Sequence, residues 1–232
     1  MTIQERFAHW KKTEAEKLRP MNVKQRAGYI LHYYRFWIAG VLLLLAVGFY
    51  IGDVVVQSQK EILLQGFFTN DAYGLFPAES IEKDYAATQD LTKRQRIVFD
   101  DALYIDLGGE ASDYTSASNG KLVAYTMTHE LDFVVTSDEV LAYYKDSMPM
   151  KDLREILPAD LQQQLGGALY TATDSEGKPS CIAVDMTGSR FVAGTGADAD
   201  PRVEHTYYLF VPESAPHTEQ MISFLRYAFR LE

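Results

Sequence analysis

"LDFVVTSDEVLAYY", residues 131–144, is the stretch that best identifies the fold class of this chain. Its first half is a short apolar run with two adjacent valines, a pattern typical of a buried strand. From Ser137 onward, acidic residues precede apolar residues at helical spacing. The stretch therefore predicts a strand that leads directly into a helix, with TSDE, residues 136–139, at the corner.

Predicted strands and helices alternate on both sides of this corner. Strands are expected at 61–68, 96–107 and 205–211, and a hairpin with a turn at Asp174–Lys178 is expected within 168–186. Helices are expected at 77–88, 115–130, 137–146, 150–157 and 214–229, the last with Ile222, Leu225 and Phe229 on one face. This order predicts an α/β domain with a mainly parallel sheet flanked by helices.

A different segment precedes this domain. Residues 36–52, FWIAGVLLLLAVGFYIG, contain no charged residue and are bounded by Arg35 and Asp53. At about 1.5 Å per helical residue, such a run covers most of a hydrocarbon core of about 30 Å. The alternatives, a buried core helix and a cleaved signal peptide, are less favoured, since the run is apolar all round and no A-x-A-like cleavage site follows it.

The charges divide at this segment. Residues 1–36 carry a net charge of +5, and the remainder carries −15 of the total of −10. Because basic residues stay on the side that is not translocated, we expect a cytoplasmic N-terminus and a single-pass signal anchor in the cell membrane. The predicted organisation is a basic tail at 1–28, a juxtamembrane and transmembrane helix at 29–56, and an extracellular α/β domain at 57–232.

The basic tail admits two interpretations. Phe7, Trp10 and Leu18 lie among charged residues, and Pro20 separates them from a second helical stretch that runs into the membrane. The first interpretation is a helix held at the membrane surface by anionic lipid headgroups. The second is a docking helix for a partner protein.

The order of motifs resembles a known family. The run KLVAYTMTHELDFVVTSDEVLAYYKDSMPMKDLREIL, residues 121–157, and the return YYLFVPESAPHTEQMISFLRYAF, residues 207–229, are similar to the first lobe of extracellular solute-binding proteins with the periplasmic-binding-protein-like type II fold. The basic aromatic tail is similar to that of membrane-anchored members. The resemblance implies a solute-binding function beside a membrane transporter.

Two features depart from that family. The only cysteine is Cys181, so the chain lacks the lipidated cysteine near the start, and no intramolecular disulfide is possible. The segment 186–205 is too short for a second lobe, and such proteins trap a ligand by closing one lobe on the other. An interaction module that has lost solute binding is therefore an open alternative to a receptor.

Ligands of open α/β sheets bind beyond the carboxyl ends of the strands. Three loops, 69–74, 108–118 and 136–139, are expected at that edge. Their candidate ligand-binding residues are Asn70, Asp71, Ser112, Tyr114, Ser116, Thr136 and Ser137. For residues 136–139, a capping box of Thr136 with Glu139 is favoured over ligand contact. The acidic domain favours a cationic, peptide or neutral ligand over an anionic one.

No catalytic or metal motif emerges. HELDF has Phe133 where a zinc-binding H-E-x-x-H helix has its second histidine, and Asp198 and Asp200 lack the glycine and later glutamate of a calcium loop. Cys181 lies in an apolar strand, where an inert buried thiol is expected.

These patterns favour a non-enzymatic binding or accessory protein. No cofactor and no nucleic-acid partner are expected, because nucleotide motifs and basic patches are missing outside the tail. The expected partners are membrane lipid and a transporter or another membrane protein. Whether a small-molecule ligand also binds stays open at this point.

Overall fold

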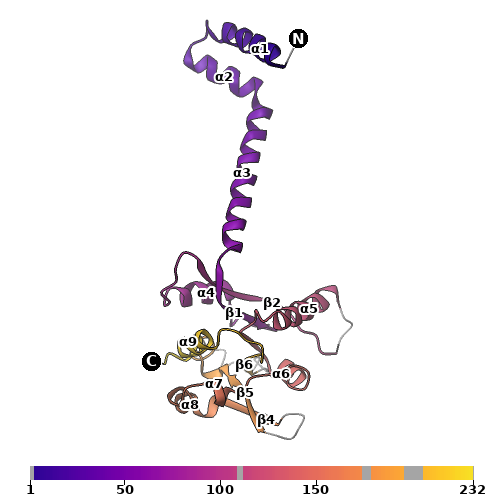
Figure 1. Ribbon diagram of the computed structural model, residues 1–232, viewed down its shortest axis with the longest axis vertical. Coiled ribbons are helices and arrows are strands. Elements are labelled where there is room, and N and C mark those ends of the chain that lie inside the picture. Colours follow the sequence, from indigo (N-terminus) through magenta and orange to yellow (C-terminus); the bar gives the residue numbers. More distant parts are fainter. Residues whose placement is uncertain (1–2, 109–111, 174–178, 196–205, 232) are drawn as a thin grey trace. The chain divides into compact units, whose positions relative to one another are not determined.

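The computed structural model describes residues 3–108, 112–173, 179–195 and 206–231 of the chain (Figure 1). It divides into two compact units, Met1–Gln59 and Lys60–Glu232.

Three helices form the first unit. They are α1 (Ile3–Leu18), α2 (Val23–Tyr33) and α3 (Arg35–Ser58). The predicted helix break at Pro20 is confirmed, since α1 ends before it and α2 begins after it. The helix predicted without interruption over 29–56 is instead broken at Tyr34, whose ring packs edge-on against that of Trp10 at 6.4 Å between centroids.

Helix α3 is long and apolar enough to cross a membrane. Its segment Arg35–Val56 has 22 residues, and the most apolar window within it has a mean hydropathy of 2.3 and is not buried within the protein. At about 1.5 Å per residue, this length matches a hydrocarbon core of about 30 Å.

A mixed six-stranded sheet organises the second unit. Its strands are β1 (Glu61–Thr69), β2 (Gln95–Leu103), β3 (Phe133–Ser137), β4 (Leu169–Thr173), β5 (Pro179–Asp185) and β6 (Tyr207–Phe210). They lie in the order β2-β1-β3-β6-β5-β4. β1 is parallel to both β2 and β3, whereas β6 is antiparallel to β3 and β5, and β4 is antiparallel to β5.

The expectation of a mainly parallel sheet is therefore wrong, because three of its five strand pairings are antiparallel. The hairpin of β4 and β5 is confirmed, although its turn, Asp174–Lys178, lies outside the described residues. A connection this short permits only antiparallel pairing, because a parallel crossover needs a dozen or more residues. β6 adds two further antiparallel pairings by inserting between β3 and β5.

Helices cover both faces of the sheet, as predicted. One face packs against α4 (Ala78–Ala86), α7 (Leu153–Ile156), α8 (Ala159–Leu165) and α9 (Thr218–Phe229). The other face packs against α5 (Asp113–Met127) and α6 (Asp138–Tyr144). The first core is rich in aromatic rings, and Phe133 stacks on Phe224 at 4.6 Å between centroids.

Two helices differ in detail from the prediction. In α9 the buried residues are Met221, Phe224, Leu225 and Ala228, so the predicted face is displaced and Ile222 and Phe229 lie at its margins. Helix α8 was not predicted, because Pro158 was interpreted only as the end of the preceding helix. Pro158 also stands at the N-cap of α8, since a proline fits the start of a helix without costing a hydrogen bond.

Candidate functional site

Asn70 lies directly after β1, at the carboxyl end of the strand, where the sequence predicts it. Its backbone is in the left-handed region, with φ of 57°, a conformation that asparagine adopts more readily than most residues. Its side-chain Nδ2 donates to Ile105 O, and Ile105 N donates to its Oδ1, both at 2.8 Å. Asn70 thus joins the loops that follow β1 and β2, and both ends of its amide are occupied by backbone.

Asp71 organises the next turn of the same loop. Its Oδ1 accepts from Leu75 N at 2.9 Å and its Oδ2 accepts from Phe76 N at 2.6 Å. The nearby Tyr207 hydroxyl donates to Asn70 O, and burial together with the Asp71 carboxylate raises the pKa of Tyr207 to about 12. The carboxylate therefore positions Phe76 for the core.

Thr136 and Ser137 are buried at the end of β3. Thr136 Oγ1 accepts a hydrogen bond of 2.6 Å from Thr69 Oγ1 on the neighbouring strand. The capping box of Thr136 with Glu139 is wrong, because β3 continues to Ser137 and α6 begins only at Asp138. Ser137 holds the N-cap position without a side-chain hydrogen bond.

The capping box occurs instead at α5. Ser112 Oγ accepts from Thr115 N at 3.1 Å, and Ser112 N donates to Thr115 Oγ1 at 3.0 Å. Ser116 is exposed within the first turn, and its backbone N–H donates to Ser112 O. The sequence signal was the Ser-x-x-Thr spacing, whose threonine takes the place of the usual glutamate or glutamine. The loop residues 109–111, part of the predicted 108–118 loop, lie outside the described residues.

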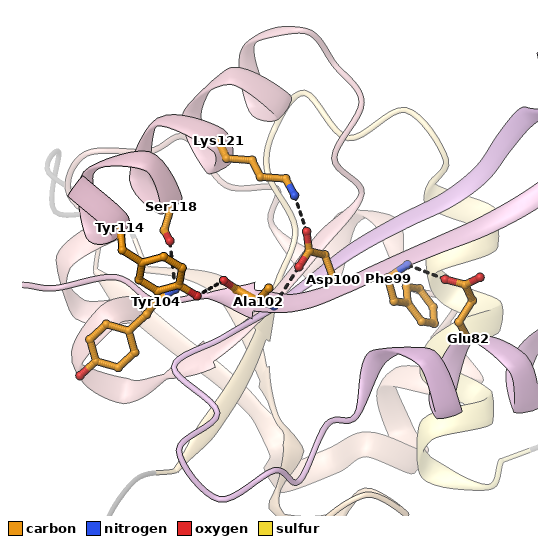
Figure 2. A network of polar contacts seen from close by, with 8 residues as sticks. All are labelled: Glu82, Phe99, Asp100, Ala102, Tyr104, Tyr114, Ser118 and Lys121. Atoms are coloured by element: carbon orange, nitrogen blue, oxygen red, sulfur yellow. Dashed lines mark hydrogen bonds and ion pairs between the residues drawn. The ribbon is translucent and has the colours of Figure 1, made fainter. Parts of the chain in front are cut away.

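Tyr114 contributes to a row of side chains along β2, which is an edge strand of the sheet (Figure 2). Its hydroxyl donates to Ala102 O. Farther along, Phe99 N donates to Glu82 Oε2 of α4 at 3.1 Å. Side chains of two helices thus hydrogen-bond to backbone groups of this edge strand.

The remaining contacts in Figure 2 complete this row. Asp100 Oδ1 accepts from Ala102 N at 2.8 Å, and its other oxygen pairs with Lys121 of α5. Just beyond the strand, Tyr104 N donates to Ser118 Oγ at 3.3 Å. An edge whose backbone is hydrogen-bonded by side chains offers few groups to an incoming strand. The β2 edge is therefore closed by side chains between Phe99 and Ala102.

The opposite edge of the sheet, β4, differs. Within the described ranges, no side chain hydrogen-bonds to the β4 backbone, and the contact of Arg154 with this strand goes to the Thr171 side chain at 3.3 Å. β4 has the sequence LYTAT, without charge or proline, and Tyr170 is 39% exposed. Within the described part of the chain, side chains thus leave the backbone groups of β4 that face away from β5 without a hydrogen bond, the feature by which edge strands pair with further strands.

Two adjoining hollows lie on the α5–α6 face, near the C-terminal ends of these helices and the start of β5. Their volumes are about 420 and about 300 Å³, and they share Ser147, Met148 and Pro149. The first is lined further by Lys145, Asp146, Met150, Ser180, Ile182 and Glu213, and the second by Asn119, Val123, Thr126, Met127, Tyr143 and Tyr144. None of the predicted site residues lines either hollow.

Tyr144 is the buried polar group of the smaller hollow. Its hydroxyl donates to Asn119 Oδ1 of α5. Burial, and to a lesser degree the neighbouring Tyr143, raises the pKa of Tyr144 to about 12, so the phenol is neutral at physiological pH. In the sequence, the signal for this region was the apolar pair Val123 and Met127, four residues apart in α5, for which no site was predicted.

Two findings concern the cysteine and metal chemistry of the described residues. Cys181 is fully buried in β5, as predicted, and burial raises the pKa of its thiol. Among the residues that the structure describes, no three of His, Cys, Asp and Glu are grouped to hold a metal ion. The Asp198 and Asp200 segment lies outside those residues.

Comparison of the chain with protein-family models, with curated proteins and with solved structures finds no match.

Proposed function

We propose that this protein is a non-enzymatic accessory subunit, anchored in the membrane by α3, whose α/β domain binds an extended segment of another membrane protein at β4. The distribution of charge along the chain supports a cytoplasmic N-terminus and an extracellular domain.

The observation that carries this proposal is the contrast between the two edges of the sheet. Side chains of α4 and α5 hydrogen-bond to the β2 backbone, whereas the described residues leave the outer backbone of β4 without such contacts. Edge strands without charge, proline or a covering element recruit further strands. Tyrosine and threonine, which make up most of β4, favour the extended conformation. In strand addition, the backbone hydrogen bonds supply affinity and the side chains supply selectivity.

The predicted solute site supports the same choice. Asn70, Asp71, Thr136 and Ser112 make their hydrogen bonds with the protein's own backbone or with neighbouring side chains. A solute at this edge competes with contacts that hold the loops together. This arrangement favours an interaction subunit over a receptor of the solute-binding type.

A solute receptor, the function that the sequence resemblance implies, is the second candidate. The two hollows on the α5–α6 face favour it, because about 300 to 420 Å³ falls at the lower end of the range of small-molecule pockets. In that case the ligand binds away from the predicted residues, next to Tyr144.

A photocrosslinking amino acid at position 170 tests the proposal in the full-length protein in its native membrane. We expect an adduct with a membrane protein, mapped by mass spectrometry to an extended segment. The matched control is the same replacement at Tyr143, which is 50% exposed on α6, compared with 39% for Tyr170. We expect no such adduct there.

Three results contradict the proposal: no adduct from position 170, equal adducts from both positions, or an adduct that joins two copies of this chain. A small molecule that raises the melting temperature of the purified protein, together with a negative crosslinking result, supports the receptor instead.

A further inference from the structure

The turn between α1 and α2 is fixed by two sets of hydrogen bonds. Asn22 and Gln25 bond reciprocally, each side chain accepting from the other's backbone N–H, at 3.1 and 2.9 Å. This arrangement is a capping box at the start of α2. Arg26 reaches back with its Nε to Met21 O at 2.9 Å and with its Nη2 to Arg19 O at 3.5 Å. The guanidinium thus binds carbonyl groups that follow the end of α1.

Aromatic contacts hold α1 next to the start of α3. Trp10, in the middle of α1, meets the ring of Tyr34 edge-on, and Tyr34 immediately precedes α3. Tyr33 contacts Tyr34 at 5.0 Å and stacks on Tyr29 at 5.5 Å. Tryptophan and tyrosine favour the boundary between hydrocarbon and water, because their rings are apolar and their N–H and O–H groups are polar. Trp10 therefore lies at the depth of the headgroups when α3 spans the membrane.

Exposed basic residues occur along the same segment of the chain. Lys11 and Lys12 follow Trp10 directly and are exposed. Arg6, Arg19, Lys24 and Arg26 are also exposed, and so is Arg35, the first residue of α3. Because Trp10 contacts Tyr34, the lysines that follow Trp10 belong to the part of α1 that lies next to the start of α3.

We infer that the hairpin of α1 and α2 docks on anionic phospholipid headgroups, with the indole of Trp10 in the interface and Lys11 and Lys12 bound to lipid phosphates. The positive charge of residues 1–36 complements such a surface, and the docking surface is continuous with α3. The inference rests on the proposed insertion of α3, and it makes the hairpin part of the membrane contact. Each basic residue near an anionic surface strengthens the binding about fivefold.

Trp10 itself can report the docking. The chain has two tryptophans, so Trp37→Phe leaves Trp10 as the only one. The full-length W37F protein is placed in nanodiscs of neutral phosphatidylcholine or of the same lipid with about 30% phosphatidylglycerol, which supplies anionic headgroups. We expect blue-shifted Trp10 emission in the anionic nanodiscs. Quenching by neutral acrylamide should be about twofold lower there, because the interface shields the indole.

Salt and charge variants identify the cause of the shift. About 1 M salt, which shortens the Debye length to about 3 Å, should restore the emission seen in neutral lipid. The double variant Lys11→Gln and Lys12→Gln should do the same at low salt. The matched control, Lys83→Gln with Lys93→Gln, removes two exposed lysines of the α/β domain and should leave the shift unchanged.

Equal quenching of Trp10 in neutral and anionic nanodiscs overturns the inference, as does a shift that persists in both the double variant and high salt. Either result favours the alternative interpretation, in which α1 binds a partner protein. Failure of the protein to insert into any nanodisc counts separately, against the anchoring function of α3.

Discussion

The carboxylate of Asp132 is fully buried and lies 3.1 Å from Nδ1 of His217, with Oδ2 as the nearest atom. The same oxygen accepts from Gln65 N at 2.7 Å, and Oδ1 accepts from the backbone N–H of His217 at 2.8 Å. Asp132 therefore joins β1, the start of β3 and the N-cap residue of α9. An anion at this place also complements the dipole of the helix.

Asp132→Asn should lower the free energy of unfolding by about 3 kcal/mol. The backbone N–H groups of Gln65 and His217 donate to the carboxylate in the unchanged protein, and in the variant one of them meets the NH₂ group of the amide. Urea unfolding of the full-length protein in detergent measures the change. Asp90→Asn is the control: Asp90 is exposed, so its effect should stay within about 0.5 kcal/mol. Equal effects of the two variants contradict the role assigned to Asp132.

Gly66→Ala should be destabilising by about 3 kcal/mol, since overpacking a filled core strains side chains and backbone. A Cβ at Gly66 would lie 2.1 Å from Cζ of Phe133, in the centre of the aromatic core. Gly120→Ala is the matched control in α5, where nothing lies within 4 Å of the added carbon. It should raise the melting temperature, because alanine favours a helix by up to about 1 kcal/mol over glycine. A Gly66 variant with unchanged stability would contradict this prediction and show that Phe133 can move.

Tyr114→Phe should loosen the closed edge of the sheet by removing the hydrogen bond to Ala102 O, at a cost of about 1 kcal/mol. Hydrogen exchange of the backbone amides in β2 should accelerate. Tyr143→Phe, which alters an exposed ring on α6, should leave β2 exchange unchanged. Unchanged exchange in the Tyr114 variant would mean that the other side chains of the row are enough to protect the β2 backbone.

Alkaline pH should destabilise the α/β domain between about pH 10 and 12. Burial raises the pKa of both Tyr144 and Tyr207 from 10.0 to about 12. In this window the unfolded state loses phenolic protons that the folded state keeps. The stability contributed by the two neutral phenols is thus complete below pH 10 and is lost as the pH rises towards 12.

Unfolding by urea at a series of pH values measures this loss. The double variant Tyr144→Phe and Tyr207→Phe should show a shallower decline than the unchanged protein. An equal decline in both proteins would assign the alkaline instability to other groups.

Local patterns predicted most of the elements. The apolar runs at 61–68 and 131–135 became β1 and β3, and the uncharged run at 36–52 lies within α3. Each depends on neighbouring residues alone, through strand propensity, burial of short apolar runs or hydropathy. Helix α8 was missed because one proline both limits the preceding helix and opens the next.

The candidate site was less predictable, because its contacts join residues that are far apart in the sequence. Asn70 and Asp71 are at the predicted edge of the sheet, but Asn70 bonds to Ile105 and approaches Tyr207, both far away in the sequence. Thr136 finds its partner, Thr69, on another strand. A polar residue after a strand indicates a possible contact, while its actual partner depends on which loops the fold brings together.

The sequence by itself determined the apolar helix, the charge difference across it and the alternation of strands and helices, because these follow from composition and short-range periodicity. Only the tertiary structure decided that β6 inserts between β3 and β5, that side chains close the β2 edge and that β4 is left at the other edge. Strand order depends on backbone hydrogen bonds between residues distant in the chain, and local periodicity carries no record of that pairing.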